Sequence, residues 1–259
     1  MPIGRRALFL LPLALRARSS SAEREGAPML TGRVAIDGRA APNLRVLLIS
    51  GDMSALLGST TTADNGTFAV AVPESANRAR VTLLVKVQGP LLAIVPHAVD
   101  LGRDGEGPHG VAIDTADGRF HRVEATVTTT SGWPPSLSFF VNPVHLEGVP
   151  APLERFFNRR DERIVEGSFF KVSPAGKSFD LTVQAGSYRI GGGFIDYRRP
   201  NLAHPTFENY AVARVDADGE ATPLPGDRSG GYLLEVPRDR RISLTLSVVP
   251  DEELSPTGL

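Results

Sequence analysis

The chain has 259 residues with 41% apolar and 22% charged residues, as in ordinary globular proteins, and its length favours two domains of about 100 residues each. The net charge of −1 argues against nucleic acid or an anionic membrane as the main partner, because phosphate binders usually carry a net basic face. Since there is no cysteine, disulfides, thiolate nucleophiles, cysteine-ligated zinc and lipid-modified cysteine anchors are excluded.

Residues 1–22 predict a secretory signal, because Arg5-Arg6 precede an apolar run over 7–15 and small residues follow at 19–22. The apolar run is too short to span a bilayer of about 30 Å, so no stable membrane insertion is expected after cleavage. The signal can be of the general secretory or the twin-arginine type, and a disordered or amphipathic tail is the alternative. We expect a bacterial protein that is secreted or periplasmic, with residues 23–29 as a linker.

The first domain is predicted over residues 30–115. Apolar or alternating runs between turn signals predict strands over 32–36, 44–50, 67–72, 81–88 and 91–95. Asn65-Gly66 is the dipeptide that favours a two-residue hairpin turn, because Gly accepts positive φ without steric cost. The segment 101–108, rich in Gly and charge, is interpreted as a loop, with the domain boundary between residues 99 and 120.

Three motifs of this domain occur together: Gly-x-Val at 32–34, Gly-x-x-x-Pro-x-x-x-Val at 38–46 and Thr-x-Asp-x-Gly-x-Phe at 62–68. In combination they resemble the carboxypeptidase regulatory-like domains over roughly residues 30–95. The resemblance implies an all-β, transthyretin-like or immunoglobulin-like seven-stranded sandwich and an accessory role. It implies no chemistry.

The second domain is predicted over residues 116–250 as a longer, diverged repeat of the first, followed by a tail at 251–259. Residues 123–127, 139–141 and 177–183 parallel 32–36, 46–48 and 66–72 in alternation and in the position of the aromatic residue. Leu153, Phe156 and Phe157 at helical spacing after Pro152 predict one short helix over 152–160. Further strands are expected at 210–215, 232–236 and 242–249, with turns at 216–219 and 230–231.

Enzymes with related sandwiches suggest alternatives that the sequence supports weakly. His145-Leu146-Glu147 has the wrong spacing for a zinc-carboxypeptidase motif. The ligand types of an iron-binding intradiol dioxygenase are present without close pairs: Tyr188, Tyr197, Tyr210, Tyr232, His97, His109, His121, His145 and His204. The C-terminus does not match the Tyr-Arg-Gly-Ser ending of the transthyretin-related hydrolase.

No Gly-x-Ser-x-Gly nucleophile elbow occurs. Gly191-Gly192-Gly193 lacks the strand-to-helix context of a phosphate loop, and a β-turn explains Asp216-Ala217-Asp218-Gly219 better than a calcium loop does. We therefore assign no catalytic, metal-binding or cofactor-binding residue and expect no cofactor.

Mixed arginine and aromatic residues in the second half suggest a partner-binding surface, since such residues anchor protein interfaces and stack on sugars. The favoured hypothesis is a non-enzymatic exported module that binds a protein or glycan of the cell envelope, or serves there as a structural accessory. The alternative is a metal-dependent enzyme on a transthyretin-like or intradiol-dioxygenase-like sandwich. The candidate surface residues are Trp133, Tyr197, Arg198, Arg199, Arg159 and Arg160.

Overall fold

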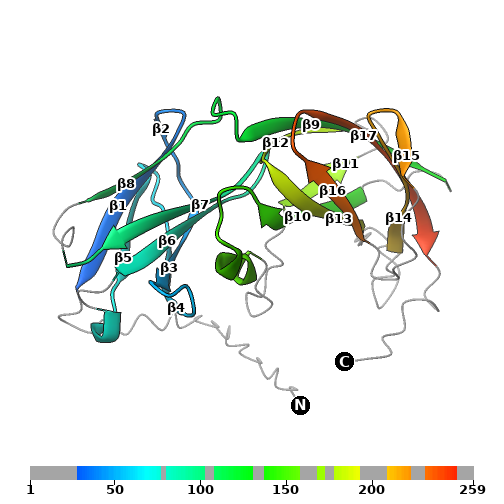
Figure 1. Cartoon of the computed structure of the whole chain (residues 1–259). Helices are drawn as coiled ribbons and strands as arrows, with labels where there is room; N and C mark the ends of the chain where they lie inside the picture. The colour runs from blue at the N-terminus through cyan, green and yellow to red at the C-terminus, as the bar shows by residue number, and fades with distance from the viewer. Residues whose placement is uncertain are drawn as a thin grey trace, which may run out of the picture.

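A computed structural model describes residues 28–76, 80–102, 108–130, 137–157, 168–172, 178–192, 209–222 and 231–249. This part of the chain is almost entirely β-strand and forms two sandwich-like halves (Figure 1). The predicted all-β sandwich fold is confirmed. The strands and 3₁₀ helices are β1 (Met29–Ile36), β2 (Arg39–Ala40), β3 (Arg45–Ser50), β4 (Leu56–Thr61), β5 (Thr67–Ala71), η1 (Glu74–Ala76), β6 (Arg80–Val87), β7 (Leu91–Asp100), β8 (His109–Ile113), β9 (Phe120–Thr129), β10 (Leu137–Leu146), η2 (Ala151–Phe156), β11 (Ser168–Val172), β12 (Ser178–Gln184), β13 (Gly186–Gly192), β14 (Asn209–Ala217), β15 (Glu220–Thr222), β16 (Gly231–Val236) and β17 (Arg240–Val249).

The first half consists of two layers. In one layer β3 pairs antiparallel with β4 and β6, and β6 pairs antiparallel with β7. The other layer is centred on β1, which pairs antiparallel with β2 and β5 and parallel with β8. A hydrophobic cluster fills the space between the layers, with Val34, Val46, Leu83 and Val85 fully buried.

The second half repeats this pairing order. β9 pairs antiparallel with β12 and parallel with β17, as β1 does with β5 and β8. β10 pairs with β11 and β13, and β13 pairs with β16, as β3, β4, β6 and β7 pair in the first half. In the second half, Phe179 of β12 pairs with Ala125 of β9. In the first half, Phe68 of β5 pairs with Gly32 of β1 at the equivalent position. The stretches that parallel each other in sequence therefore lie in equivalent strands, while the domain boundary at residues 115 and 116 stays a prediction.

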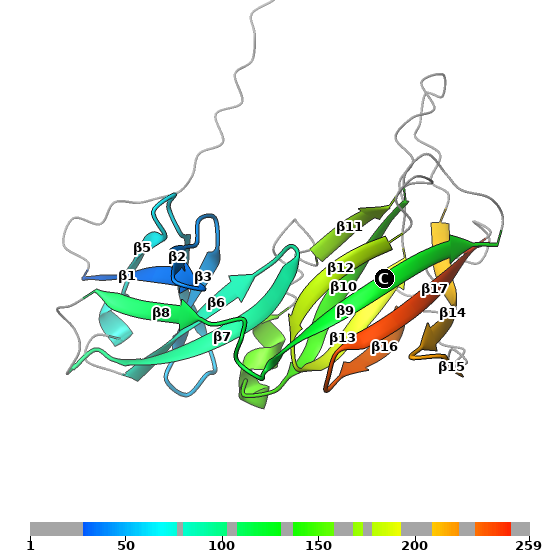
Figure 2. The same ribbon diagram turned by 90° about the horizontal axis from the view of Figure 1, so that it is seen from above.

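One nine-stranded sheet runs through both halves, because β12 pairs in parallel with the start of β7 (Figure 2). That pairing joins Thr182 and Val183 to Leu91 and Leu92. A second hydrophobic cluster crosses the same joint and combines first-half residues such as Leu47, Leu84 and Ile94 with Phe157, Tyr188 and the second-half core. Two first-half strands of this sheet, β3 and β6, are thus buried on both faces, which explains their continuous apolar runs.

The predicted Asn65-Gly66 hairpin is wrong. The strands on either side of it, β4 and β5, belong to different sheets, so residues 62–66 cross from one layer to the other. Gly66 has φ of +78°, whereas Asn65 is not in the positive-φ region. Asn65 instead uses its Oδ1 atom to accept hydrogen bonds from the backbone N–H and the hydroxyl of Thr67, at 3.0 and 2.7 Å.

The predicted helix over 152–160 is a shorter 3₁₀ helix, η2, which begins at Ala151 and ends at Phe156. Pro152 stands in its first turn, and Leu153, Phe156 and Phe157 are buried as the helical spacing predicts. The segment 101–108, interpreted as a loop, is followed at once by β8, a strand that the sequence analysis missed along with β4 and β11. The predicted turn at 216–219 is confirmed, since Ala217 pairs with Glu220 around Asp218-Gly219.

Candidate functional site

The candidate partner-binding residues inferred from the sequence lie outside the described residues. This applies to Trp133, Tyr197, Arg198, Arg199, Arg159 and Arg160. The part of the chain that the structure describes offers a different candidate, an open groove at the joint between the two halves.

The groove has a volume of about 790 Å³. One wall is the β1–β2 hairpin and the chain that follows it, the opposite wall is the turn between β6 and β7, and Thr182 of β12 contributes from the second half. The lining is mainly aliphatic side chains and prolines, with a carboxylate and a guanidinium at the rim and no aromatic ring. The lining residues are Ile36, Asp37, Arg39, Ala40, Ala41, Pro42, Leu44, Val87, Gln88, Pro90, Leu91, Thr115 and Thr182.

The hairpin wall is held in place by Asp37. Asp37 and Gly38 both have positive φ, +48° and +75°, as a two-residue hairpin turn of type I′ requires. The Asp37 N–H donates to the carbonyl of Ile113 at 2.8 Å, and its carboxylate accepts hydrogen bonds from the backbone N–H and hydroxyl of Thr115, each at 2.8 Å. These bonds, led by the backbone one, hold the pKa of Asp37 below its ordinary value, and Arg39 lowers it further. The rim of the groove therefore carries a fixed negative charge at neutral pH.

The opposite wall is held by a backbone contact between the halves. The Thr182 N–H donates to the carbonyl of Pro90 at 2.8 Å, next to the short parallel pairing of β12 with β7. Because this wall and the hairpin are each fixed to a sheet, the groove is preformed.

A buried polar cluster lies behind the groove, under the joint. The side chain of Gln184, 3% exposed, accepts a hydrogen bond from the Ile94 N–H and donates one to the carbonyl of Glu147. The Tyr188 hydroxyl donates to the carbonyl of Gln184 at 2.5 Å, and burial raises the pKa of this phenol. Lys86 lies beside Tyr188 around a cavity of about 20 Å³, room for one water molecule.

The residue types considered for iron or zinc form no metal-binding group among the described residues, where no set of three His, Asp or Glu side chains is placed to hold an ion. The rings of His97 and His109 lie edge to face, with their centroids 6.5 Å apart. His145 pairs with Glu154 at 2.5 Å, and Tyr188 is a neutral phenol within the core. The side chains of Tyr197, Tyr210 and His204 are outside the described set.

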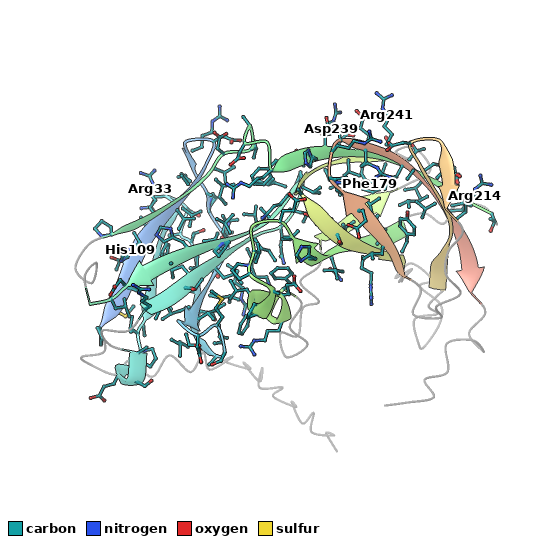
Figure 3. The ribbon with its side chains drawn as sticks, in the orientation of Figure 1. Arg33, His109, Phe179, Arg214, Asp239 and Arg241 are labelled. Atoms are coloured by element: carbon teal, nitrogen blue, oxygen red, sulfur yellow. The ribbon has the colours of Figure 1, made fainter. Side chains whose placement is uncertain are left out.

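The outer face of the second half is covered by paired charges. Arg122 bonds to Asp180 at 3.0 Å and to Glu124 at 3.1 Å, and Arg241 bonds to Glu124 at 3.0 Å. Figure 3 shows Arg241 and Arg214 pointing away from the ribbon. Acidic and basic side chains thus alternate among the described residues of this face.

Sequence reasoning missed the groove because its walls come from segments about fifty residues or more apart in the chain. The Asp37-Gly38 dipeptide signals the hairpin, but no local pattern places Pro90 against Thr182. Among the described residues, no helical segment is long and apolar enough to cross a membrane.

No protein-family profile and no curated protein matches this sequence. Solved structures that match the chain include the shaft pilin SpaA from Lactobacillus rhamnosus GG, at 9% identity and TM-score 0.28, over 86% of this chain and 98% of that chain. A streptococcal ancillary pilin matches at 11% identity and TM-score 0.26, over 86% of this chain and 70% of that one. A DUF3823 family protein from Parabacteroides merdae matches at 14% identity and TM-score 0.25, over 64% of this chain and 91% of the other.

Proposed function

We propose that this protein is a non-enzymatic exported binding module that holds an extended segment of a cell-envelope partner in the groove between its halves. The observation that carries the proposal is the preformed groove of about 790 Å³, with an aliphatic floor and the Asp37 and Arg39 charges at its rim. A site of this kind can bind and orient a chain. It offers a reactant neither an activated nucleophile nor, among the described residues, a metal cluster.

A protein segment fits the groove better than a glycan. Prolines and aliphatic side chains line it, whereas no aromatic ring is available there to stack on a sugar. A glycan remains the second candidate, favoured by the Trp133, Tyr197 and arginine surface inferred from the sequence. The signal inferred at residues 1–22 supports export to the periplasm or the medium, where such partners occur.

Thermal unfolding of the full chain tests the proposal, using extended peptides, envelope oligosaccharides and iron or zinc salts as probes. A ligand present at a hundredfold excess over its dissociation constant adds about 2.7 kcal/mol to the stability. We expect a stabilising peptide whose effect disappears in Ala40→Trp, which fills the groove, and persists in Thr126→Trp, which adds the same ring to the outer face. If only iron or zinc raises the unfolding temperature, the proposal is overturned in favour of the metal-dependent enzyme. If a glycan raises it equally in the Ala40→Trp variant, the binding site lies outside the groove.

A further inference from the structure

We propose that the outer edge of β8 is a docking edge that accepts an antiparallel β-strand from a partner protein. This edge is separate from the groove and rests on different residues. Its evidence is the direction of its backbone groups, the contrast with the neighbouring edge, and the internal repeat.

The backbone groups of Gly110 and Ala112 face away from the sheet. The Ile113 carbonyl accepts the N–H of Asp37, so the backbone groups of Ile113 face the β1 side. The backbone groups of successive residues in a strand point to opposite sides of the strand. The N–H and C=O groups of Gly110 and Ala112 therefore point away from β1. Within the described chain, β8 pairs with β1 alone.

The neighbouring edge of β7 is protected, in contrast to that of β8. The Ile94 N–H, which points away from β6, donates to the Gln184 side chain at 3.1 Å. Two residues on, Pro96 has no N–H to offer. Proline is one of the devices by which sheets avoid unwanted pairing, and β8 contains neither proline nor a Lys, Arg, Asp or Glu side chain.

The second half shows an occupied version of the same edge. Ile242 of β17 pairs with Ala125 of β9, just as His109 of β8 pairs with Gly32 of β1. Because β9 is the equivalent of β1, β17 is the equivalent of β8. Along its outer edge β17 carries β14, which pairs antiparallel from Asn209 to Ala217. In the first half, no strand among the described residues pairs with the equivalent edge of β8.

The pattern of β14 defines the strand that β8 would accept. Val215 and Ala217, opposite Leu244 and Ile242, are buried in the core, while Arg214 is exposed. At the C-terminal end of β8, a cleft of about 80 Å³ opens between β8 and β7, lined by Ile94, Pro96, Ala112, Ile113 and Phe120 among others. This is space for one aliphatic side chain. The partner is therefore an extended segment with an apolar residue at every second position.

A second copy of the chain is a poorer occupant. Antiparallel pairing of two β8 strands would involve five residues on each side, and the exposed ones are the small Gly110 and Ala112. Such a contact falls far short of the roughly 1,200 Å² that stable interfaces bury. A flexible segment can instead follow the edge and fill the cleft as well.

The probe is a synthetic, spin-labelled nonapeptide with the sequence of residues 209–217, added to the isotope-labelled full chain. We expect saturable binding that broadens the amide signals of Gly110 and Ala112 and not those of Ser243 and Thr245. Ala112→Pro, which removes an outward N–H without touching the β1 ladder, should weaken binding at least tenfold, and Gly110→Pro provides a second variant. Ala98→Pro is the matched control, because Ala98 lies two residues beyond Pro96 on the protected edge.

Equal binding by Ala112→Pro and the unchanged chain, or broadening confined to Ser243 and Thr245, would overturn the proposal. So would a dimer of the chain, seen by sedimentation, that dissociates in Ala112→Pro, since the occupant would then be a second copy. Ala40→Trp, which fills the groove, should leave peptide binding at β8 unchanged. Failure of one site is thereby distinguishable from failure of the other.

Discussion

Gln184 is the residue on which the joint between the halves depends most. From the end of β12 it contacts β7 through Ile94, the loop after β10 through Glu147, and Tyr188 through its own carbonyl. All three contacts are hydrogen bonds of a residue that is 3% exposed. A buried amide with its partners satisfied fixes the relative position of the segments it bonds.

Replacing Gln184 by Leu should destabilise the protein by roughly 2–4 kcal/mol, because the Ile94 N–H and the Glu147 carbonyl would each lose a partner worth about 1–3 kcal/mol. Urea unfolding of the full chain measures the change. Thr126→Leu, at an exposed position of β9, is the control and should change stability by less than about 0.5 kcal/mol. A Gln184→Leu protein as stable as the control would show that the cluster does not hold the joint.

The carboxylate of Asp37 should make the groove wall sensitive to acid. Its pKa is lowered on folding, so its ionised form contributes stability above the ordinary value of 3.8, and this contribution is lost as pH falls through the folded pKa. Thr115→Val removes the hydroxyl donor and keeps the backbone donor. We expect the pKa of Asp37, followed by NMR of its side-chain carboxyl carbon, to rise in this variant yet stay below the ordinary value. An unchanged pKa would assign the shift to other groups, and Thr128→Val on the outer face is the control.

At the scale of elements, alternation predicted most strands, whereas turn dipeptides were a less consistent signal. Asp37-Gly38 and Asp218-Gly219 form two-residue hairpins with both residues at positive φ. Asn65-Gly66 looks the same in sequence, but Asn65 is not at positive φ and the strand after it joins another sheet. A dipeptide alone therefore determines neither the turn nor the partner of the next strand, which is decided by which face can be buried.

The missed strand β8 and the groove have a common physical explanation. β8 is five residues long, follows a segment rich in Gly and charge, and gains its order from parallel pairing with the distant β1. The groove likewise depends on Pro90 meeting Thr182 across the joint. Long-range pairing of this kind leaves no periodic signal in the local sequence.

Gly38 and Gly66 have similar φ values but different surroundings. Comparing their Ala variants therefore distinguishes the cost of backbone strain from the cost of steric crowding. Gly66 has φ of +78°, and a Cβ there would lie 2.5 Å from the Val34 carbonyl oxygen, whereas Gly38, at +75°, has open space. Gly38→Ala should cost about 1–2 kcal/mol from backbone strain. Gly66→Ala should cost at least about 1 kcal/mol more, since the crossing loop must also move away from β1. Urea unfolding of both variants measures the difference, and equal losses would mean that the loop yields without cost.

The two halves of the molecule share one pairing order and differ at their edges. In the second half β14 pairs with the edge of β17, and β12 pairs with β7 of the first half, which gives the chain one continuous sheet. In the first half, no strand within the described residues pairs with the outer edge of β8. Similar strand patterns in the two halves could be recognised from the sequence, but the joint and the β8 edge follow only from pairing, because equivalent sequences here have different neighbours.

The shared sheet and the shared core predict that the two halves unfold together. Leu47, Leu84 and Ile94 lie in the first half but pack in the same cluster as Phe157, so unfolding of the second half would expose them. Phe157→Ala should cost about 3–5 kcal/mol, and Leu83→Ala, in the other cluster, about 2–5 kcal/mol. Calorimetry of the full chain should show one transition, with equal calorimetric and van't Hoff enthalpies, that both substitutions shift downward while Thr126→Ala leaves it in place. Two transitions, each lowered by only one of the core substitutions, would show instead that the halves fold independently.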